Sequence, residues 1–173
     1  GSTEGLSGYL TSYNYHENWG DLLIEYGGNS ITYDSIGNPL TYGDDVLLWD
    51  GRLLTEYHEI YGYWIDEYTY QESEDVFEYR YNSNGIRTGK TINGIRHEYV
   101  IDKNKIVREA VYSYDGSYIS QDNRFYYDVE GNPCAIRSIE IERNGSISGD
   151  NTYYLETNIQ GDVIAIYNSD GVK

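Results

Sequence analysis

The chain has 173 residues, of which 29 are acidic and 12 basic, so its formal net charge at pH 7 is −17. A polyanion repels phosphate groups, which argues against nucleic acid as a partner and against attraction to an anionic membrane surface. The apolar content is dominated by 22 Tyr, with two Phe and no Met. Because tyrosine carries a hydroxyl on an apolar ring, this composition favours a sheet with at least one face near water over a thick dry core.

The elements expected in chain order are nearly all strands. Residues 3–18 have room for one or two helical turns, and Gly5 and Gly8 argue against more. Leu22 to Tyr26 and Ser30 to Asp34 then flank a first hairpin turn. The later runs of alternating, aromatic or β-branched residues predict strands at Tyr61–Tyr70, Phe77–Tyr81, Ile95–Ile101, Ile106–Tyr114, Arg124–Asp128, Ser138–Glu142, Tyr153–Glu156 and Val163–Tyr167.

Turn signals lie between these runs. Asn84-Gly85, Asn93-Gly94 and Asn144-Gly145 predict two-residue hairpin loops, because both residues of such pairs tolerate positive φ. No Pro-rich or Ser-rich linker interrupts the series. The sequence therefore predicts an all-β fold, an antiparallel, hairpin-rich, curved sheet of about a dozen strands with little or no helix. Further turn candidates are Gly27-Gly28, Asp50-Gly51, Asp115-Gly116 and Asp170-Gly171.

One turn is repeated almost a hundred residues apart. Tyr33 to Pro39 and Tyr127 to Pro133 match at five of seven positions, and Tyr81 to Gly85 is a looser copy. In such a turn the Asp accepts hydrogen bonds from amides two or three residues on, Gly supplies the positive φ, and Asn-Pro restarts the chain in extended geometry. Internal repetition indicates a stacked array and makes catalysis the less expected function.

Four stretches, two of which contain copies of this turn, resemble RHS (rearrangement hot spot) or YD-repeat proteins. The likeness is strongest to the repeat region of Gram-positive, Clostridia-type members, just upstream of the RHS-associated core. It covers roughly residues 19–171. The four stretches are Trp19–Leu23 running into Ile31–Pro39, Leu48–Leu54, Tyr79–Thr88, and Tyr153–Val163 followed by Asp170 and Gly171.

The resemblance implies that the chain is a structural segment of a shell in which a β-sheet ribbon spirals around a hollow interior. Such shells enclose a C-terminal toxin in polymorphic toxins, and related sheets serve cell-surface adhesion. The resemblance therefore implies no catalysis, no cofactor and no metal. The positions it marks as structural are Tyr33, Asp34, Gly37, Asn38, Tyr81, Asn82, Gly85, Tyr127, Asp128, Gly131, Asn132, Asn158, Gly161 and Asp162.

The sequence departs from the family pattern in two ways. Asn82 stands where Asp is expected, although Asn can form a similar turn. The sequence also stops at Lys173, before any self-cleaving core or toxin. We therefore expect an excised fragment, with a cloning remnant at residues 1–2, a lead-in at 3–18 and a YD-repeat sheet unit at 19–173.

The family also sets expectations for location and partners. A secreted or cell-surface protein of a bacterium is expected, without a transmembrane segment, since no run approaches the roughly 18 apolar residues that a span needs. The expected partners are the rest of the parent chain and an enclosed toxin domain. Exposed sheet edges are expected to let the fragment self-associate.

The residue types that carry chemistry are sparse. His16, His58 and His97 are far apart in sequence and lack metal-ligand spacing. Cys134 follows a turn and has no neighbouring His, so a small buried side chain is the better interpretation. The pair Asp44-Asp45 lacks the spacing of a calcium loop, which favours a solvated turn.

A binding function remains the alternative. Aromatic residues make up 16% of the chain, so an extracellular β module could recognise carbohydrate or protein through an aromatic face. Trp19, Trp49 and Trp64 are the candidates for stacking on a ligand. Trp19 and Trp49 lie inside the family-like stretches, which suits a packing role better, and exposure in the structure separates the two interpretations.

Overall fold

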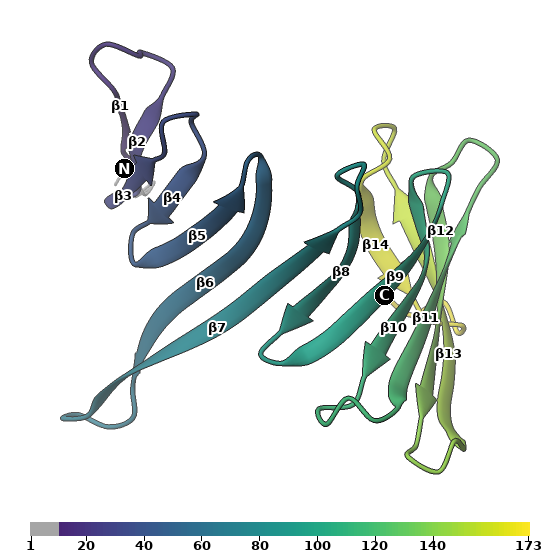
Figure 1. Ribbon diagram of the computed structural model, residues 1–173. Coiled ribbons are helices and arrows are strands. Elements are labelled where there is room, and N and C mark those ends of the chain that lie inside the picture. The colour runs from purple at the N-terminus through teal and green to yellow at the C-terminus, as the bar shows by residue number, and fades with distance from the viewer. Residues whose placement is uncertain (1–10) are drawn as a thin grey trace, which may run out of the picture. The chain divides into compact units, whose positions relative to one another are not determined.

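The computed structural model describes residues 11–173 (Figure 1), which form fourteen β-strands and no helix. The strands are antiparallel, and their hydrogen-bonded order follows their order in the chain from β1 to β14. Each strand is therefore joined to the next by a hairpin connection, as Figure 1 shows. The all-β, antiparallel, hairpin-rich fold predicted from the sequence is confirmed.

The chain divides into two compact units, one ending at Asp75 and the other beginning at Val76, so β7 contributes to both. Within each unit neighbouring strands pair along the sheet. The strands of the first unit are β1 Tyr13–Tyr15, β2 Leu23–Tyr26, β3 Asn29–Tyr33, β4 Pro39–Tyr42, β5 Asp45–Asp50, β6 Leu53–Trp64 and the start of β7 Tyr70–Tyr81. Those of the second are the rest of β7, β8 Arg87–Ile92, β9 Ile95–Asp102, β10 Lys105–Tyr112, β11 Ile119–Tyr127, β12 Pro133–Ile141, β13 Ile147–Thr157 and β14 Val163–Tyr167.

Burial is shallow throughout the described residues. The buried apolar residues are Ala110, Ile139 and Ala165, and no large side chain is completely enclosed. Three polar residues are also buried. The tyrosine-rich, wet-faced sheet that the composition indicated is thus what forms, and neighbouring strands must be held mainly by ladder hydrogen bonds and cross-strand side-chain pairs. The buried polar residues are Asn38, Asp122 and Ser138.

Strand glycines lie beneath long side chains from the neighbouring strand. Arg80 pairs directly with Gly89, and its guanidinium donates past it to the carbonyl of His97 at 3.0 Å. Glu140 pairs with Gly149 and lies across it in the same way. A Cβ at either glycine would crowd these side chains, so Gly at these positions makes room for the partner to lie flat on the sheet.

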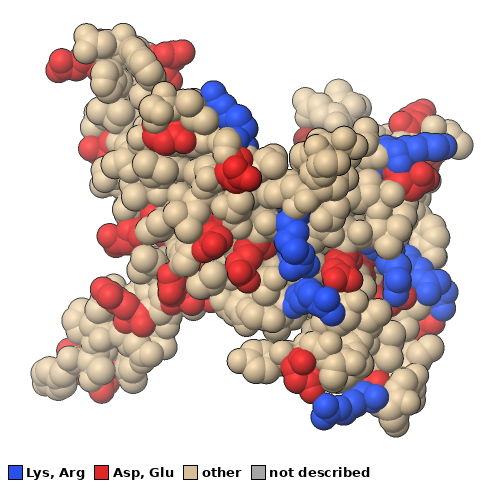
Figure 2. All heavy atoms as spheres, viewed as in Figure 1, with Lys and Arg blue, Asp and Glu red and all other residues tan. Residues whose placement is uncertain are grey.

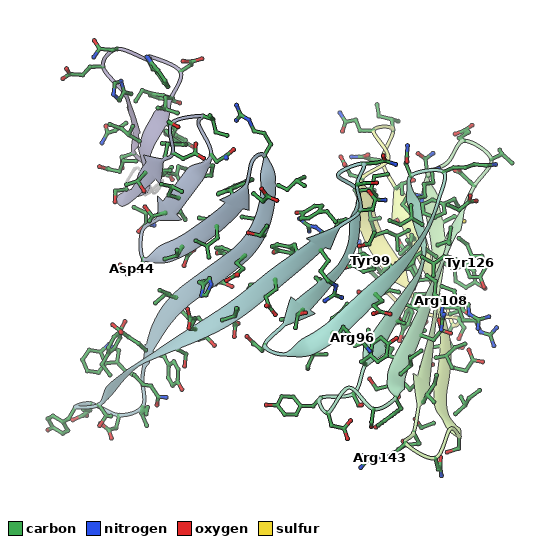
Figure 3. The ribbon with its side chains drawn as sticks, viewed as in Figure 1. Asp44, Arg96, Tyr99, Arg108, Tyr126 and Arg143 are labelled. Atoms are coloured by element: carbon green, nitrogen blue, oxygen red, sulfur yellow. The ribbon has the colours of Figure 1, made fainter. Side chains whose placement is uncertain are left out.

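An ionic ladder crosses one face of the second unit. Asp122 on β11 accepts hydrogen bonds from Arg108 Nε at 2.8 Å and from Arg124 at 3.3 Å. Arg137 on β12 forms a bidentate pair with Asp150 on β13, at 2.8 and 2.6 Å. Since Arg108, Arg124 and Arg137 are direct cross-strand neighbours, the carboxylates separate like charges that would otherwise repel. Figure 3 labels Arg108 on this ladder.

Most predicted strands form, with shifted ends. Val163–Tyr167 is reproduced as β14, while the run predicted to reach Tyr114 ends two residues earlier, at Tyr112. Within the described part of the lead-in, a strand, β1, forms in place of a helical turn, and residues 1–10 lie outside the described range.

Three local predictions were wrong. The aromatic run Tyr61–Tyr70 is a hairpin and not one strand, because Asp66 Oδ1 accepts the amides of Tyr68 at 2.9 Å and Thr69 at 2.8 Å and so closes a turn. Asn84-Gly85 and Asn144-Gly145 do not form two-residue loops. They lie inside five-residue loops, and among the described residues their asparagines lack the positive φ that a two-residue loop of this type requires.

Candidate functional site

The repeated turn has one geometry at five places. In each, the first residue is Asp or Asn, and its side-chain oxygen accepts the amides two and four residues on, at 2.8–3.0 Å. We predicted amides two or three residues on, so the second amide lies one residue further along the chain than predicted. The five turns begin at Asp34, Asn82, Asp128, Asn158 and Asn168.

Main-chain hydrogen bonds close each of these turns in the same way. The amide of the first residue donates to the carbonyl of the fifth, and the amide of the fourth donates back to the first. The fourth residue is always glycine, with φ between 73° and 93°. Only glycine adopts this backbone without strain, which explains Gly37, Gly85, Gly131 and Gly161 in the repeat.

The tyrosine before the turn anchors it to the preceding strand. Tyr33 donates its hydroxyl proton to the carbonyl of Leu23 on β2 at 2.6 Å, and Tyr127 donates to the carbonyl of Ile106 on β10 at 2.8 Å. Burial raises the pKa of Tyr127, which keeps the hydroxyl protonated as a donor. The looser copy differs, because Tyr81 accepts a hydrogen bond from Arg87 at 3.1 Å.

Some turns also contact a neighbouring turn. Asn38 donates its side-chain amide to Asp34 at 2.8 Å and to the carbonyl of Gly51 at 2.7 Å. In the second unit Lys105 donates to the carbonyl of Gly131 at 2.6 Å. These bonds link adjacent hairpins along one edge of the sheet, and no single hairpin could form them alone.

Sequence reasoning missed two further turns. The turn at Asn168 has the complete geometry, although the sequence was noted only for its Asp170-Gly171 pair. The turn at Glu142 has the same main-chain bonds, but Asn144 in the third position accepts the amide of Ser146 instead. In both turns, the sequence signal that identifies the turn is a glycine at the fourth position after the end of a strand.

The histidines are held within strands or turns. His16 Nδ1 accepts the amides of Asn18 and Trp19 at 3.2 and 3.3 Å. His58 lies between Glu74, at 2.6 Å, and Glu56, at 3.1 Å. The hydrogen bond to Glu74 and then that to Glu56 raise the pKa of His58, because both favour the imidazolium form.

A polar network around His97 crosses four strands of the second unit. His97 Nδ1 lies 2.9 Å from Glu109, whose other oxygen accepts the amide of Asn123 at 3.0 Å. Gln121 donates to Asn123 at 3.0 Å and to Ser138 Oγ at 2.8 Å. Each of these polar groups has a partner within the network, so the arrangement stabilises the sheet. Ser138 contacts Gln121 and His97 contacts Glu109, so this network contains no hydrogen bond between a serine hydroxyl and the histidine.

Tyr99 lies directly opposite Glu109 on the neighbouring strand. Burial raises the pKa of Tyr99 to about 12, and the Glu109 carboxylate adds to the effect. A phenol with so high a pKa stays protonated near neutral pH and is unsuited to general acid–base catalysis there.

The remaining candidate residues, Asp44, Asp45 and Cys134, do not come together in a catalytic or metal-binding cluster. Asp45 accepts the Tyr57 hydroxyl at 2.8 Å and the amide of Ile60 at 2.9 Å, so its carboxylate is engaged in holding β5 to β6. A shallow hollow of about 220 Å³ lies beside Asp44 and Asp45. Cys134 is a half-buried free thiol. Among residues 11–173, no group of three His, Cys, Asp or Glu side chains could hold a metal ion.

The three tryptophans differ in exposure. Trp49 is half-buried and donates its indole N–H to the carbonyl of Pro39 at 2.7 Å, so it has a packing role. Trp19 and Trp64 are exposed, by 60% and 66%. Trp64 belongs to a larger group of exposed aromatic side chains at the end of the β6–β7 hairpin, residues 61–70, which we call the aromatic hairpin.

Comparison with models of known protein families gave no match, and comparison with curated proteins gave none either. No helix that could cross a membrane exists in the described part of the chain. The candidate site is therefore defined by geometry alone: five equivalent turns, the bonds between neighbouring turns, and one exposed aromatic hairpin.

Proposed function

We propose that this chain is a non-catalytic wall segment of an RHS/YD-repeat shell in a secreted or surface-exposed bacterial protein. The observation that carries the proposal is the fivefold recurrence of one turn, with the same acceptor contacts, the same main-chain bonds and glycine in the same position. A turn that recurs unchanged at five edge positions is the mark of a repeating scaffold.

The strand order supports the same function. Because every strand pairs with its neighbours in the chain, the sheet can be lengthened by adding hairpins without altering existing contacts. The bonds from Asn38 to Gly51 and from Lys105 to Gly131 join successive hairpins, which is what a wall that grows along one direction requires. The parent chain and an enclosed toxin domain are the proposed partners.

β14 is an outermost strand of the sheet in the described residues. β14 pairs with β13 and with no other strand in residues 11–173. Its side chains Ile164 and Ile166 are more than half exposed. An edge of this kind is a template for another strand, either from the same chain in a longer product or from a second copy.

Hydrogen exchange tests the proposal at that edge. In the full product of the gene that encodes this chain, the outward amides of β14 are expected to exchange much more slowly than in the 173-residue chain at low concentration. The amides of β13, paired in both proteins, are the internal control. Equal exchange of β14 in the two proteins would contradict a continuing wall.

A second candidate function is favoured by the aromatic hairpin. Its exposed rings resemble neither the turn tyrosines, which donate to neighbouring strands, nor Trp49, which is engaged by Pro39. This supports recognition of carbohydrate or protein by the first unit. Calorimetric titration of the chain with soluble oligosaccharides and with peptides tests it, and absence of heat at millimolar ligand would contradict it.

A further inference from the structure

The aromatic hairpin exposes six large apolar or aromatic side chains within ten residues. Tyr68 is 90% exposed and Trp64 66% exposed, and the others are between 42% and 58% exposed. Scattered exposed apolar residues need no explanation, but a contiguous group on one hairpin indicates an interaction surface. The six are Tyr61, Tyr63, Trp64, Ile65, Tyr68 and Tyr70.

The hairpin is locally ordered by specific contacts. The Trp64 and Tyr70 rings meet edge to face, with centroids 5.1 Å apart. Tyr70 lies across Gly62, where a Cβ would collide with its hydroxyl. Hydrogen bonds from the amides of Tyr68 and Thr69 lower the pKa of Asp66 and fix the turn. The Trp64 and Tyr70 rings are therefore presented in a set arrangement before any ligand arrives, which reduces the entropy lost on binding.

The charge around the hairpin is predominantly negative. Residues 53–75 contain seven acidic residues and no Lys or Arg. Over residues 1–75 there are fifteen acidic residues and one basic residue, Arg52, a net charge of −14, whereas residues 76–173 carry −3. Figure 2 shows acidic and no basic atoms over the outer end of the β6–β7 hairpin.

The second unit shows how this chain uses tyrosine when a cation is nearby. Arg96 lies 3.6 Å from the ring centroid of Tyr112, and Arg87 lies 4.0 Å from that of Tyr79. Lys105 likewise lies 4.7 Å from the centre of the Tyr127 ring. In the first unit the one basic residue, Arg52, points its guanidinium toward Asn38 at 3.4 Å. The aromatic hairpin therefore combines aromatic ring faces with nearby acidic residues. Its own unit supplies no Lys or Arg to lie over those rings.

We propose that the aromatic hairpin binds an arginine- or lysine-rich segment of a partner protein. The rings of Trp64 and Tyr68 accept the cation over their faces, which is worth about 0.5–1 kcal/mol per pair at an exposed site. Glu72 supplies a carboxylate from the face that Tyr70 occupies, since residues two apart on a strand share a face. A second copy of the chain is a poor occupant because both copies carry −17. The proposal is independent of the shell proposal.

Fluorescence anisotropy with short labelled peptides tests the inference. The probe is an eight-residue peptide of alternating Arg and Gly, and the reference peptide replaces each Arg with Gln. The chain is expected to bind the Arg peptide and not the Gln peptide. Tyr68→Ser and Trp64→Ser are each expected to weaken binding by about two- to fivefold. Because Tyr68 is almost fully exposed, its replacement leaves the hairpin folded even if the Trp64 variant does not.

Matched controls separate a site from general attraction to a polyanion. The first control, Tyr114→Ser, removes a tyrosine that is 83% exposed but lies in the β10–β11 loop. The second control, Glu130→Gln, removes one charge outside the aromatic hairpin, and the test variant Glu72→Gln removes one charge at the proposed site. The controls are expected to leave affinity unchanged, while Glu72→Gln lowers it by about twofold at low salt. Equal weakening by the controls, or binding of the Gln peptide, overturns the proposal. The proposal is also overturned if the chain binds a neutral hexasaccharide and not the Arg peptide, and if Trp64→Ser weakens that binding to the same extent.

Discussion

The side-chain amide of Asn38 donates a hydrogen bond to the main-chain carbonyl of Gly51 at 2.7 Å, joining the β3–β4 turn to the β5–β6 turn. The same amide donates to Asp34 at 2.8 Å, so one side chain stabilises its own turn and couples it to the next. Asn38 is 3% exposed, the most deeply buried polar residue in the described chain. In this copy of the motif, one side chain thus combines local turn formation with a contact between hairpins.

Replacing Asn38 with Ala is expected to lower the free energy of unfolding of the first unit by about 1–3 kcal/mol, because it removes the two hydrogen bonds that this buried side chain donates, to Asp34 and to the carbonyl of Gly51. Urea unfolding followed by tryptophan fluorescence reports on this unit, since all three tryptophans lie within residues 1–75. The control is Asn132→Ala, at the same position of the other repeat, where the side chain donates to Asp128 at 3.3 Å. Because no tryptophan lies in the second unit, the unfolding of the control is followed by circular dichroism. A loss as large in the control would count against the coupling between turns.

The turn carboxylate at Asp128 is expected to make the second unit sensitive to acid. Hydrogen bonds from the Asn132 amide, and others in the turn, lower the pKa of Asp128 below its usual 3.8. Its contribution is present above that usual value and is lost as pH falls through the lowered pKa. Asp128→Ala should remove this part of the acid transition and speed amide exchange in the loop, whereas Glu130→Ala in the same turn should leave both unchanged.

His58 is expected to titrate above the usual 6.5, because Glu74 and then Glu56 stabilise its charged form. Its contribution to stability is full below pH 6.5 and is lost as pH rises through the raised pKa. Proton NMR of the imidazole measures the pKa directly. Glu74→Gln should lower it, and Glu72→Gln, on the same strand, should change it little. Equal pKa values in wild type and Glu74→Gln would contradict the ion pair.

Asp122 is expected to be the sensitive member of the ionic ladder. Its side chain is 8% exposed, and Asp122→Ala would leave the neighbouring Arg108 and Arg124 facing each other without a counter-charge. A loss of about 1–3 kcal/mol is expected in the second unit. Asp150→Ala is the control, since that pair is more than a third exposed and surface ion pairs contribute little. Urea unfolding followed by circular dichroism compares the two.

The sequence predicted the repeated turn because its determinants are local. Asp34 and Gly37 lie within a few residues of the amides and backbone angles they control, so their roles follow from residue type. The contact of Asn38 with Gly51 depends on which hairpins are neighbours. The network from His97 to Ser138 depends on the register of four strands. Neither depends on spacing along the chain, so neither could be predicted.

Two local features escaped prediction for a different reason. Lys103 and Asn104 form a two-residue loop with φ of 47° and 65° although neither is glycine, so the usual turn signal is missing there. The aromatic hairpin turns at Asp66, whose neighbours favour strands. At Lys103-Asn104 the pairing of Asp102 with Lys105 sets the turn, whereas in the aromatic hairpin the Asp66 carboxylate sets it. The strand preferences of the surrounding residues reveal neither turn.

Electron cryo-microscopy of the full product of the encoding gene distinguishes a segment of a shell wall from an isolated domain. We expect a hollow particle whose wall is a continuous β-ribbon, with residues 11–173 fitted as successive hairpins and a further strand hydrogen-bonded to the outer edge of β14. A particle in which this segment is an isolated domain, with the β14 edge open to solvent or covered by a helix, would contradict it.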